Sequence, residues 1–487
     1  MKKNLKYILI LLAVLLVLGG AAALLLLFPQ DGGDEASSLP VSSEVSENER
    51  ITNRETADVK AVTVKNALAN FVLVPADEEF TIEGYENYPV NRSIVRNTVD
   101  ALARLQVAKD LGERADLSDF GLTGADCVNV ELQYKDGTSD KLVLGANPGE
   151  TAGRYVLKDG KVYVGLGISD YLYGDGFEYF SSQLYSIPTR TEPTTDDEGN
   201  AMSKEAEDIL YSLKLSGAQF PEPIEISYDN RAVSLYLITE PVMAESGNAA
   251  HTTVMDDLKA LTQADRVVYA GPDDKTLEQY GLKEPAAIAE FDLNSQKHTL
   301  TVSAATSDGL RYLMLDDNDM IYQVHDSVVS SWAAADLMKL RQGYIWLANI
   351  MQVRHMTVTV DGDMLYAFDT ERELDEDRST EQNPYYDLTI KNAAGQTLDF
   401  VTYRSFYQDL LAIAVMSEER TETTGDPAWE VAYQYFDGGV DKVSFYPFGD
   451  DRYIAKLNGE FNGIVRKSDA DKIVARLPEI TQTLAEE

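Results

Sequence analysis

Three stretches of the chain begin with Arg-Tyr and continue in one pattern: RYVLKDGKVY (154–163), RYLMLDDNDMIY (311–322) and RYIAKLNGEF (452–461). In each stretch a strand-like run is interrupted by a polar turn and then resumes, which is typical of a β-hairpin. A hairpin that recurs along a chain indicates repeated structural units. We expect the tyrosines of these hairpins to point inward and the arginines to lie on the solvated face.

A second repeated feature precedes the first two hairpins. ADLSDFGLTGA (115–125) corresponds to KTLEQYGLKEPA (275–286), and in both an acidic helical turn runs into an aromatic-Gly-Leu corner. Glycine at such a corner permits a positive φ or a close turn. An amphipathic segment lies upstream of each corner, and alternating strands lie downstream. The predicted corner residues are Phe120, Gly121 and Leu122 in one copy and Tyr280, Gly281 and Leu282 in the other.

These correspondences predict the organisation of the folded part of the chain. We expect a first unit at residues 57–190, a connection at 191–215 with a helix from about Ser203, and a second unit at 216–350. Residues 351–487 form a divergent third unit, in which only the last portion of the pattern is recognisable. Runs of strands with interspersed helices and short turns predict an α+β fold with mainly antiparallel sheets.

The first 28 residues predict a membrane anchor. Lys2, Lys3 and Lys6 precede a run of 22 uncharged residues that begins at Tyr7 and ends at Phe28. A helix of that length spans the roughly 30 Å hydrocarbon core of a bilayer. The lysines favour a cytoplasmic N-terminus, so the bulk of the chain is expected to be extracytoplasmic. A cleaved signal peptide is the competing interpretation, although its apolar region is usually shorter, at ~7–15 residues.

The composition of the remaining chain narrows its partners. Residues 29–56 are rich in Ser, Glu, Gly and Pro and predict a flexible tether. The net charge of −39 repels nucleic-acid phosphates, so we expect no nucleic-acid partner. The single cysteine, Cys127, excludes an intrachain disulfide and is expected to be a small buried residue.

No motif in the sequence predicts a catalytic, cofactor or metal site. The four histidines lack the companions that zinc requires, and no nucleophile elbow or phosphate-binding loop occurs. His325, Asp326 and Ser327 are contiguous, and a helix N-cap by Asp326 or Ser327 explains them better than a triad. Two acidic segments, at 195–200 and 315–320, resemble fragments of calcium loops without the full ligand spacing, so weak calcium binding stays open.

The anchor, the corner at residues 116–122, KDG at 135–137, VLG at 143–145 and the ending at 446–473 together resemble a bacterial family, domain of unknown function 4340. The resemblance covers roughly residues 60–480. GLKEPA at 281–286 keeps the family-like Gly-Leu-x-x-Pro form, whereas the first copy, GLTGA, lacks the proline. Members are often encoded beside gliding-motility-type ABC transporter components. The resemblance therefore implies an extracytoplasmic accessory of an ABC-2-type export complex, and it supplies no active residues.

Three functions are therefore considered. The leading one is a membrane-anchored, non-catalytic interaction module that binds a protein partner in a transporter complex. The second is a solute- or glycan-binding receptor that uses tyrosines, of which the chain has 27. The third, a cell-envelope enzyme with a carboxylate pair, is the least favoured because the 81 acidic residues make any chosen pair arbitrary.

Overall fold

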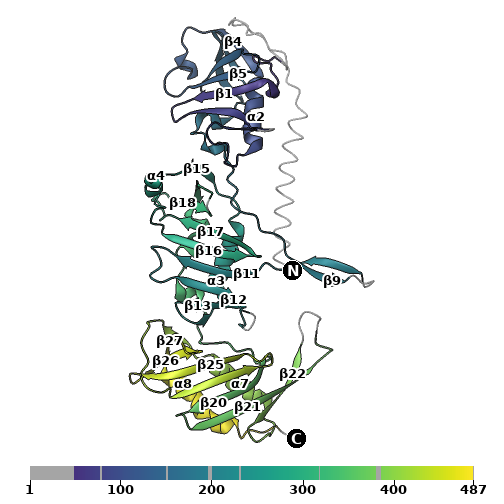
Figure 1. The fold of residues 1–487 in the computed structure, drawn as a ribbon, viewed down its shortest axis with the longest axis vertical. Helices are drawn as coiled ribbons and strands as arrows, with labels where there is room; N and C mark the ends of the chain where they lie inside the picture. The colour runs from purple at the N-terminus through teal and green to yellow at the C-terminus, as the bar shows by residue number, and fades with distance from the viewer. Residues whose placement is uncertain are drawn as a thin grey trace, which may run out of the picture.

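The structure is a computed structural model, and it consists of three large antiparallel sheets with short helices (Figure 1). It describes residues 49–76, 79–149, 152–195, 200–229, 232–316, 318–379 and 385–485. The α+β class predicted from the sequence is confirmed, and sheet dominates over helix. The predicted anchor at residues 7–28 lies outside the described residues. No helix among the described residues combines the length and the apolar character that a membrane crossing requires.

Each sheet is built from strands that follow one another closely in the chain. The first contains β1 (Val59–Lys65), β2 (Asn70–Ala76), β3 (Glu79–Ile82), β4 (Val107–Glu113), β5 (Val128–Tyr134), β6 (Ser139–Leu144), β7 (Arg154–Lys158) and β8 (Lys161–Gly165). The second contains β11 (Leu210–Ser216), β12 (Ile224–Tyr228), β13 (Tyr236–Glu240), β14 (Ala244–Glu245), β15 (Arg266–Ala270), β16 (Ala287–Leu293), β17 (Gln296–Val302), β18 (Leu310–Leu315) and β19 (Met320–His325). The third contains β20 (Val353–Val360), β21 (Met364–Leu374), β22 (Tyr386–Asn392), β23 (Val415–Ser417), β24 (Trp429–Tyr435), β25 (Val440–Phe448), β26 (Arg452–Leu457) and β27 (Glu460–Arg466).

All three sheets have the same strand order. It is β3-β2-β1-β5-β6-β7-β8-β4 in the first sheet and β22-β21-β20-β24-β25-β26-β27-β23 in the third. The second follows the same order, with the two-residue β14 added beside β13. We call the three sheets with their helices the first, second and third units. The third unit therefore has the whole arrangement, although its sequence showed only the last portion of the pattern.

One longer helix follows the third main strand of each unit. These helices are α2 (Arg92–Ala103), α3 (Ala249–Ala260) and α7 (Phe400–Leu411). Each begins after an Asn or Asp whose side chain accepts a hydrogen bond from a backbone N–H of the first turn: Asn91, Asn248 and Asp399. Such a side chain satisfies a donor that the helix itself leaves unpaired. The closing helix α8 (Lys467–Ile480) is found in the third unit.

Three parts of the predicted organisation are wrong. The segment from Ser203 is not a helix: β9 (Thr191–Thr195) and β10 (Ala201–Glu205) form a separate two-stranded sheet of exposed residues. Residues 210–215 were predicted to belong to the connection, yet they form most of β11, which is central in the second sheet because its apolar residues alternate. Residues 50–56 do not form a tether, since Thr52 is buried and donates a hydrogen bond to the Leu102 carbonyl at 2.6 Å.

Consecutive units are joined by a short extended segment that pairs with both of them. Phe180 forms an antiparallel bridge with Val90 of the first unit, and three residues later Gln183 bridges Gln263 of the second. The next joint repeats this pattern: Arg341 bridges Ser246 of the second unit, and Tyr344 bridges Ala414 of the third. In both joints, the bridge to the preceding unit lies just before the long helix of that unit, α2 or α3. The bridge to the following unit lies just before its edge strand, β15 or β23. This shared backbone pairing fixes how neighbouring units sit.

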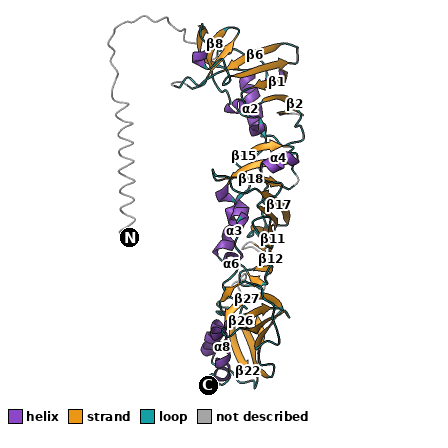
Figure 2. Cartoon of the chain, turned by 90° about the vertical axis from the view of Figure 1, so that its left-hand side faces the viewer, coloured by secondary structure: helices purple, strands orange, loops and turns teal. Residues whose placement is uncertain are grey.

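The units are arranged one after another along the long axis of the molecule (Figures 1 and 2). One continuous apolar core spans the first and second units, and a separate core fills the third. Ala232 and Leu237 of the second unit contribute to the core of the third. Apolar contact thus reinforces the backbone pairing at both joints.

Candidate functional site

The predicted corner residues occupy corresponding positions in the first and second units. Gly121 and Gly281 both adopt positive φ, 64° and 68°. The ring of Phe120 meets the hairpin residue Tyr155 edge-on at 4.9 Å between centroids, and Tyr280 meets Tyr312 in the same way at 4.6 Å. The corners therefore pack against the Arg-Tyr hairpins and hold them in place. Leu122 and Leu282 are buried beside them.

The hairpin arginines of these two units are not simply solvated, contrary to the prediction. Arg311 is buried, pairs with Asp326 at 2.5 Å and donates to the Ser303 carbonyl at 2.8 Å. Arg154 pairs with Asp170 at 2.5 Å in the same way. A charged group leaves water when a carboxylate and a carbonyl replace its hydration. Only the third arginine, Arg452, is exposed as predicted.

In the contiguous group His325-Asp326-Ser327, Asp326 is the residue that forms the ion pair with Arg311. The N-cap residue of the short helix η5 (Asp326–Val328) is His325, and no side chain caps it. The prediction of a cap by Asp326 or Ser327 is therefore wrong, because the Asp326 carboxylate accepts a hydrogen bond from Arg311 instead.

Cys127 is buried, and its thiol donates to the Gly124 carbonyl.

The richest polar chemistry lies at the joint between the second and third units. The Arg341 side chain is fully buried there, and its Nη1 and Nη2 donate to the backbone carbonyl and the Oδ1 of Asn462 at 2.5 and 2.9 Å. Asn462 in turn donates from Nδ2 to the carbonyls of Met243 and Ile345 at 2.6 and 3.0 Å. Hydrogen bonds from one third-unit side chain thus reach the end of the second unit and the joint segment. We call Arg341 and Asn462 the joint pair.

A serine and a histidine lie close to the joint pair. Ser246 Oγ is 2.7 Å from His251 Nδ1, a distance suited to a nucleophile and its base. However, Ser246 is 0% exposed and His251 is 2% exposed, so no substrate reaches them. Burial lowers the pKa of His251 to about 4, which keeps the ring neutral at pH 7. Ser246 Oγ also lies 3.2 Å from the Leu340 carbonyl, next to Arg341, so the pair belongs to the joint, and sequence reasoning did not single it out.

A cleft of about 400 Å³ opens beside this joint. Its apolar wall comes from the second unit, including Phe220, Ile224, Val242 and Leu337, and the third unit contributes Glu418 and Arg420. Such a concave apolar site with a few charged groups is the usual form of a binding site. We call it the joint cleft.

The two charged third-unit residues of the joint cleft differ in their partners: Glu418 lacks a hydrogen-bond donor at Oε1, whereas Arg420 is ion-paired. Glu418 Oε1 is buried and has no hydrogen-bond donor among the described residues, and the nearest cation is Arg341 Nη1 at 3.9 Å. Burial raises the pKa of Glu418, while burial lowers the pKa of Arg341 to about 10. Arg420 lies at the rim and pairs with Glu222 and Glu240 at 3.9 and 3.7 Å.

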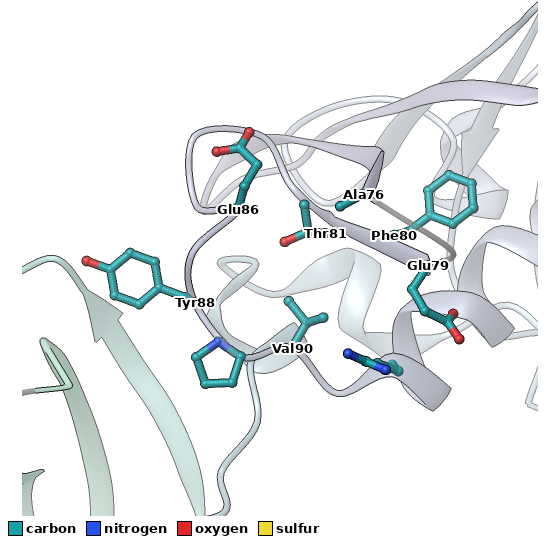
Figure 3. Close-up of a pocket in the computed structure, with 9 residues that line it drawn as sticks. Ala76, Glu79, Phe80, Thr81, Glu86, Tyr88 and Val90 are labelled. Atoms are coloured by element: carbon teal, nitrogen blue, oxygen red, sulfur yellow. The ribbon is translucent and has the colours of Figure 1, made fainter.

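A second cleft, of about 520 Å³, lies on the first unit near the other joint (Figure 3). Glu79, Thr81, Glu86, Tyr88 and Arg92 supply its polar groups. The Oγ1 atom of the buried Thr81 makes no hydrogen bond within the described part of the chain. The cleft therefore mixes carboxylates, hydroxyls and a guanidinium beside apolar groups.

No metal site accompanies these clefts in the described structure. Within the seven described segments, no group of three His, Cys, Asp or Glu side chains is placed to hold a metal ion. In the possible calcium segment at 315–320, Asp316 accepts hydrogen bonds from His298 Nδ1 and the Thr299 backbone N–H, and Asp317 lies outside the described residues. Most of the segment at 195–200 lies outside the described residues.

Comparison with known proteins identifies one family. The model described as Domain of unknown function (DUF4340) matches residues 81–191 and 238–398, which is more than half of the chain. The two matches cover much of the first unit and extend from the second unit into the third, and they confirm the resemblance seen in the sequence. No curated protein and no solved structure matched the chain.

Proposed function

The chain belongs to the family described as Domain of unknown function (DUF4340), and from that premise we propose that it is a membrane-anchored, extracytoplasmic interaction module without catalytic activity. Its partner in this proposal is a membrane subunit of an ABC-2-type, gliding-motility-like transporter. The N-terminal residues 7–28 serve as the single-pass anchor, which keeps the three units close to that subunit.

The observation that carries the proposal is the threefold repetition of one unit through two identically built joints. Stacked repeats with fixed joints form an extended surface, which is the form that repeat proteins use for protein recognition. The chemically suggestive pair, Ser246 and His251, is buried within a joint, and in this proposal it serves the packing of the second and third units.

Affinity capture of the full chain tests this proposal. Cells expressing the tagged chain are treated with a cleavable cross-linker, the membranes are solubilised, and captured proteins are identified by mass spectrometry. We expect a permease subunit of an ABC transporter to be enriched over a control membrane protein that carries the same anchor sequence. Equal recovery of permease with both baits argues against the proposal.

A solute or glycan receptor is the second candidate, and the first-unit cleft favours it. Hydroxyl-rich ligands both donate and accept hydrogen bonds, and the cleft offers the carboxylates of Glu79 and Glu86 as acceptors and the guanidinium of Arg92 as a donor. Thermal-shift measurements with neutral saccharides test this function. A stabilisation that is lost in Arg92→Ala supports it, and a flat response across the saccharides removes it.

A further inference from the structure

We propose that the joint cleft binds a lysine or arginine side chain from a basic segment of the partner protein, with the cation placed against Glu418. This inference rests on the proposed function, because it names the chemistry by which the module recognises its partner. Three features of the joint cleft lead to it: an unsatisfied carboxylate, an apolar wall and an acidic rim.

The carboxylate lacks a donor because the neighbouring guanidinium is already occupied. Arg341 donates to Asn462, to the Gln342 carbonyl at 3.2 Å and to the Tyr344 carbonyl at 3.5 Å. These bonds use four of its five N–H groups, and its Nη1 atom lies 3.9 Å from Glu418 Oε1, which is an ion-pair distance but too long for a hydrogen bond. The Glu418 side chain is 17% exposed, and its Oε1 atom is buried without a hydrogen bond. A buried oxygen without a donor is costly, and an incoming N–H⁺ group at the accessible part of the carboxylate lowers that cost.

The wall beside Glu418 suits an alkyl stem. Phe220, Ile224 and Val242 are buried and Leu337 is half-buried, and all four line the cleft. Lysine and arginine place their methylene groups along such apolar surfaces while the charged head reaches a polar group. A small inorganic cation gains nothing from this wall.

The rim selects for positive charge. Glu222 and Asp336 lie at the edge of the cleft with Glu418, and Arg420 is the one basic residue among the described lining residues. The whole chain carries a net charge of −39. An anionic ligand would face three lining carboxylates against the single cation Arg420, which already pairs with Glu222 and Glu240, so a basic partner segment is the complementary occupant.

The probe is a blocked pentapeptide, Ala-Ala-Lys-Ala-Ala, compared with the same peptide carrying acetyl-lysine, which has no charge. Binding to the detergent-solubilised full chain is followed by ligand-detected NMR. We expect the lysine peptide to bind at least ~10-fold more tightly than the acetyl-lysine peptide, as one well-placed charged contact implies. Equal binding of the two peptides, or no binding of either, overturns the inference.

Variants distinguish binding in the joint cleft from general attraction of the peptide to the acidic surface. Glu418→Gln removes the cation partner and is expected to abolish the preference, whereas Glu419→Gln removes an exposed carboxylate next to it and is expected to keep it. Because Glu418→Gln leaves Arg341 without its ion pair, Ala334→Trp provides an independent test. Ala334 is exposed and lines the cleft, so the indole fills the space while the core stays intact. Retained binding in a folded Ala334→Trp chain contradicts the inference.

Failure of this inference and failure of the proposed function give different results. If wild type and Glu418→Gln both capture the permease while the peptide does not bind, the cleft inference falls and the module function stands. If the peptide binds with the expected preference and no permease is captured, the site stands and the proposed function falls.

Discussion

Replacement of Asn462 by alanine tests whether the second and third units form one rigid body. Asn462 is 0% exposed, and its side chain makes three hydrogen bonds that end on Arg341, Met243 and Ile345. Because Arg341 and Ile345 are buried in the intact joint, we expect the groups that bond to the amide to stay out of contact with water when it is removed. The joint should therefore lose the full contribution of the amide.

The expected cost follows from the kinds of bond. Two bonds to neutral carbonyls contribute about 1 kcal/mol each, and the bond from the guanidinium contributes about 2 kcal/mol, so Asn462→Ala should lower the free energy of unfolding by about 4 kcal/mol. Buried groups that are left unpaired account for much of this sum. A loss of this size is large compared with typical single substitutions of about 1 kcal/mol.

Urea unfolding followed by tryptophan fluorescence measures the loss and locates it. The chain has three tryptophans, and Trp332 lies in the second unit whereas Trp429 lies in the third. Single-tryptophan versions should show coincident transitions in the wild type and separate transitions in Asn462→Ala. Gln408→Ala removes an exposed amide from helix α7 of the third unit; it is the control and should stay within about 0.5 kcal/mol of wild type. A wild-type-like midpoint for Asn462→Ala would refute the reasoning.

Three further predictions concern single side chains. Arg311→Ala removes a buried, ion-paired guanidinium and should cost about 3–5 kcal/mol in chemical denaturation, whereas Arg452→Ala at the corresponding exposed position should cost almost nothing; equal losses would contradict the assigned difference in burial. Gly145→Ala places a Cβ against a backbone carbonyl and should cost about 2–3 kcal/mol, while Gly343→Ala meets no atom within 4 Å and should be neutral; calorimetry that ranks them otherwise would count against the corner packing. Burial lowers the pKa of His251 from 6.5 to about 4, so the contribution of the neutral ring to the free energy of unfolding is complete above pH 6.5 and has fallen by about 2 kcal/mol at pH 5. His251→Gln should therefore lose less stability than wild type between these two pH values, and parallel pH profiles of stability would rule this out.

Part of the fold was predictable because it is encoded locally. The corners at Phe120 and Tyr280 share an aromatic-Gly-Leu pattern, and positive φ at the glycine explains why that pattern recurs. The strands of the third unit were also recognisable by alternation. The sequence did not show that these strands form a complete unit with the same strand order as the other two. Strand order depends on which strand faces are buried, and different apolar residues can be buried on the same face.

The site was not predictable from the same information. Arg341 lies in the polar-looking sequence KLRQG, and nothing local distinguishes a buried arginine from an exposed one. Its partner Asn462 is 121 positions away, so only the folded chain brings them together. The joint cleft is likewise lined by segments from two units, whereas sequence reasoning considered each motif separately.

In-cell photo-cross-linking shows whether the three units contact a transporter subunit, as we propose. A photoreactive phenylalanine analogue replaces one exposed apolar residue in each unit: Leu68 (71% exposed), Val233 (56%) or Val401 (75%). The account predicts that at least one position yields an adduct with a membrane subunit of an ABC transporter. Adducts only with unrelated envelope proteins, or no adducts from chains shown to reside in the membrane, would contradict it.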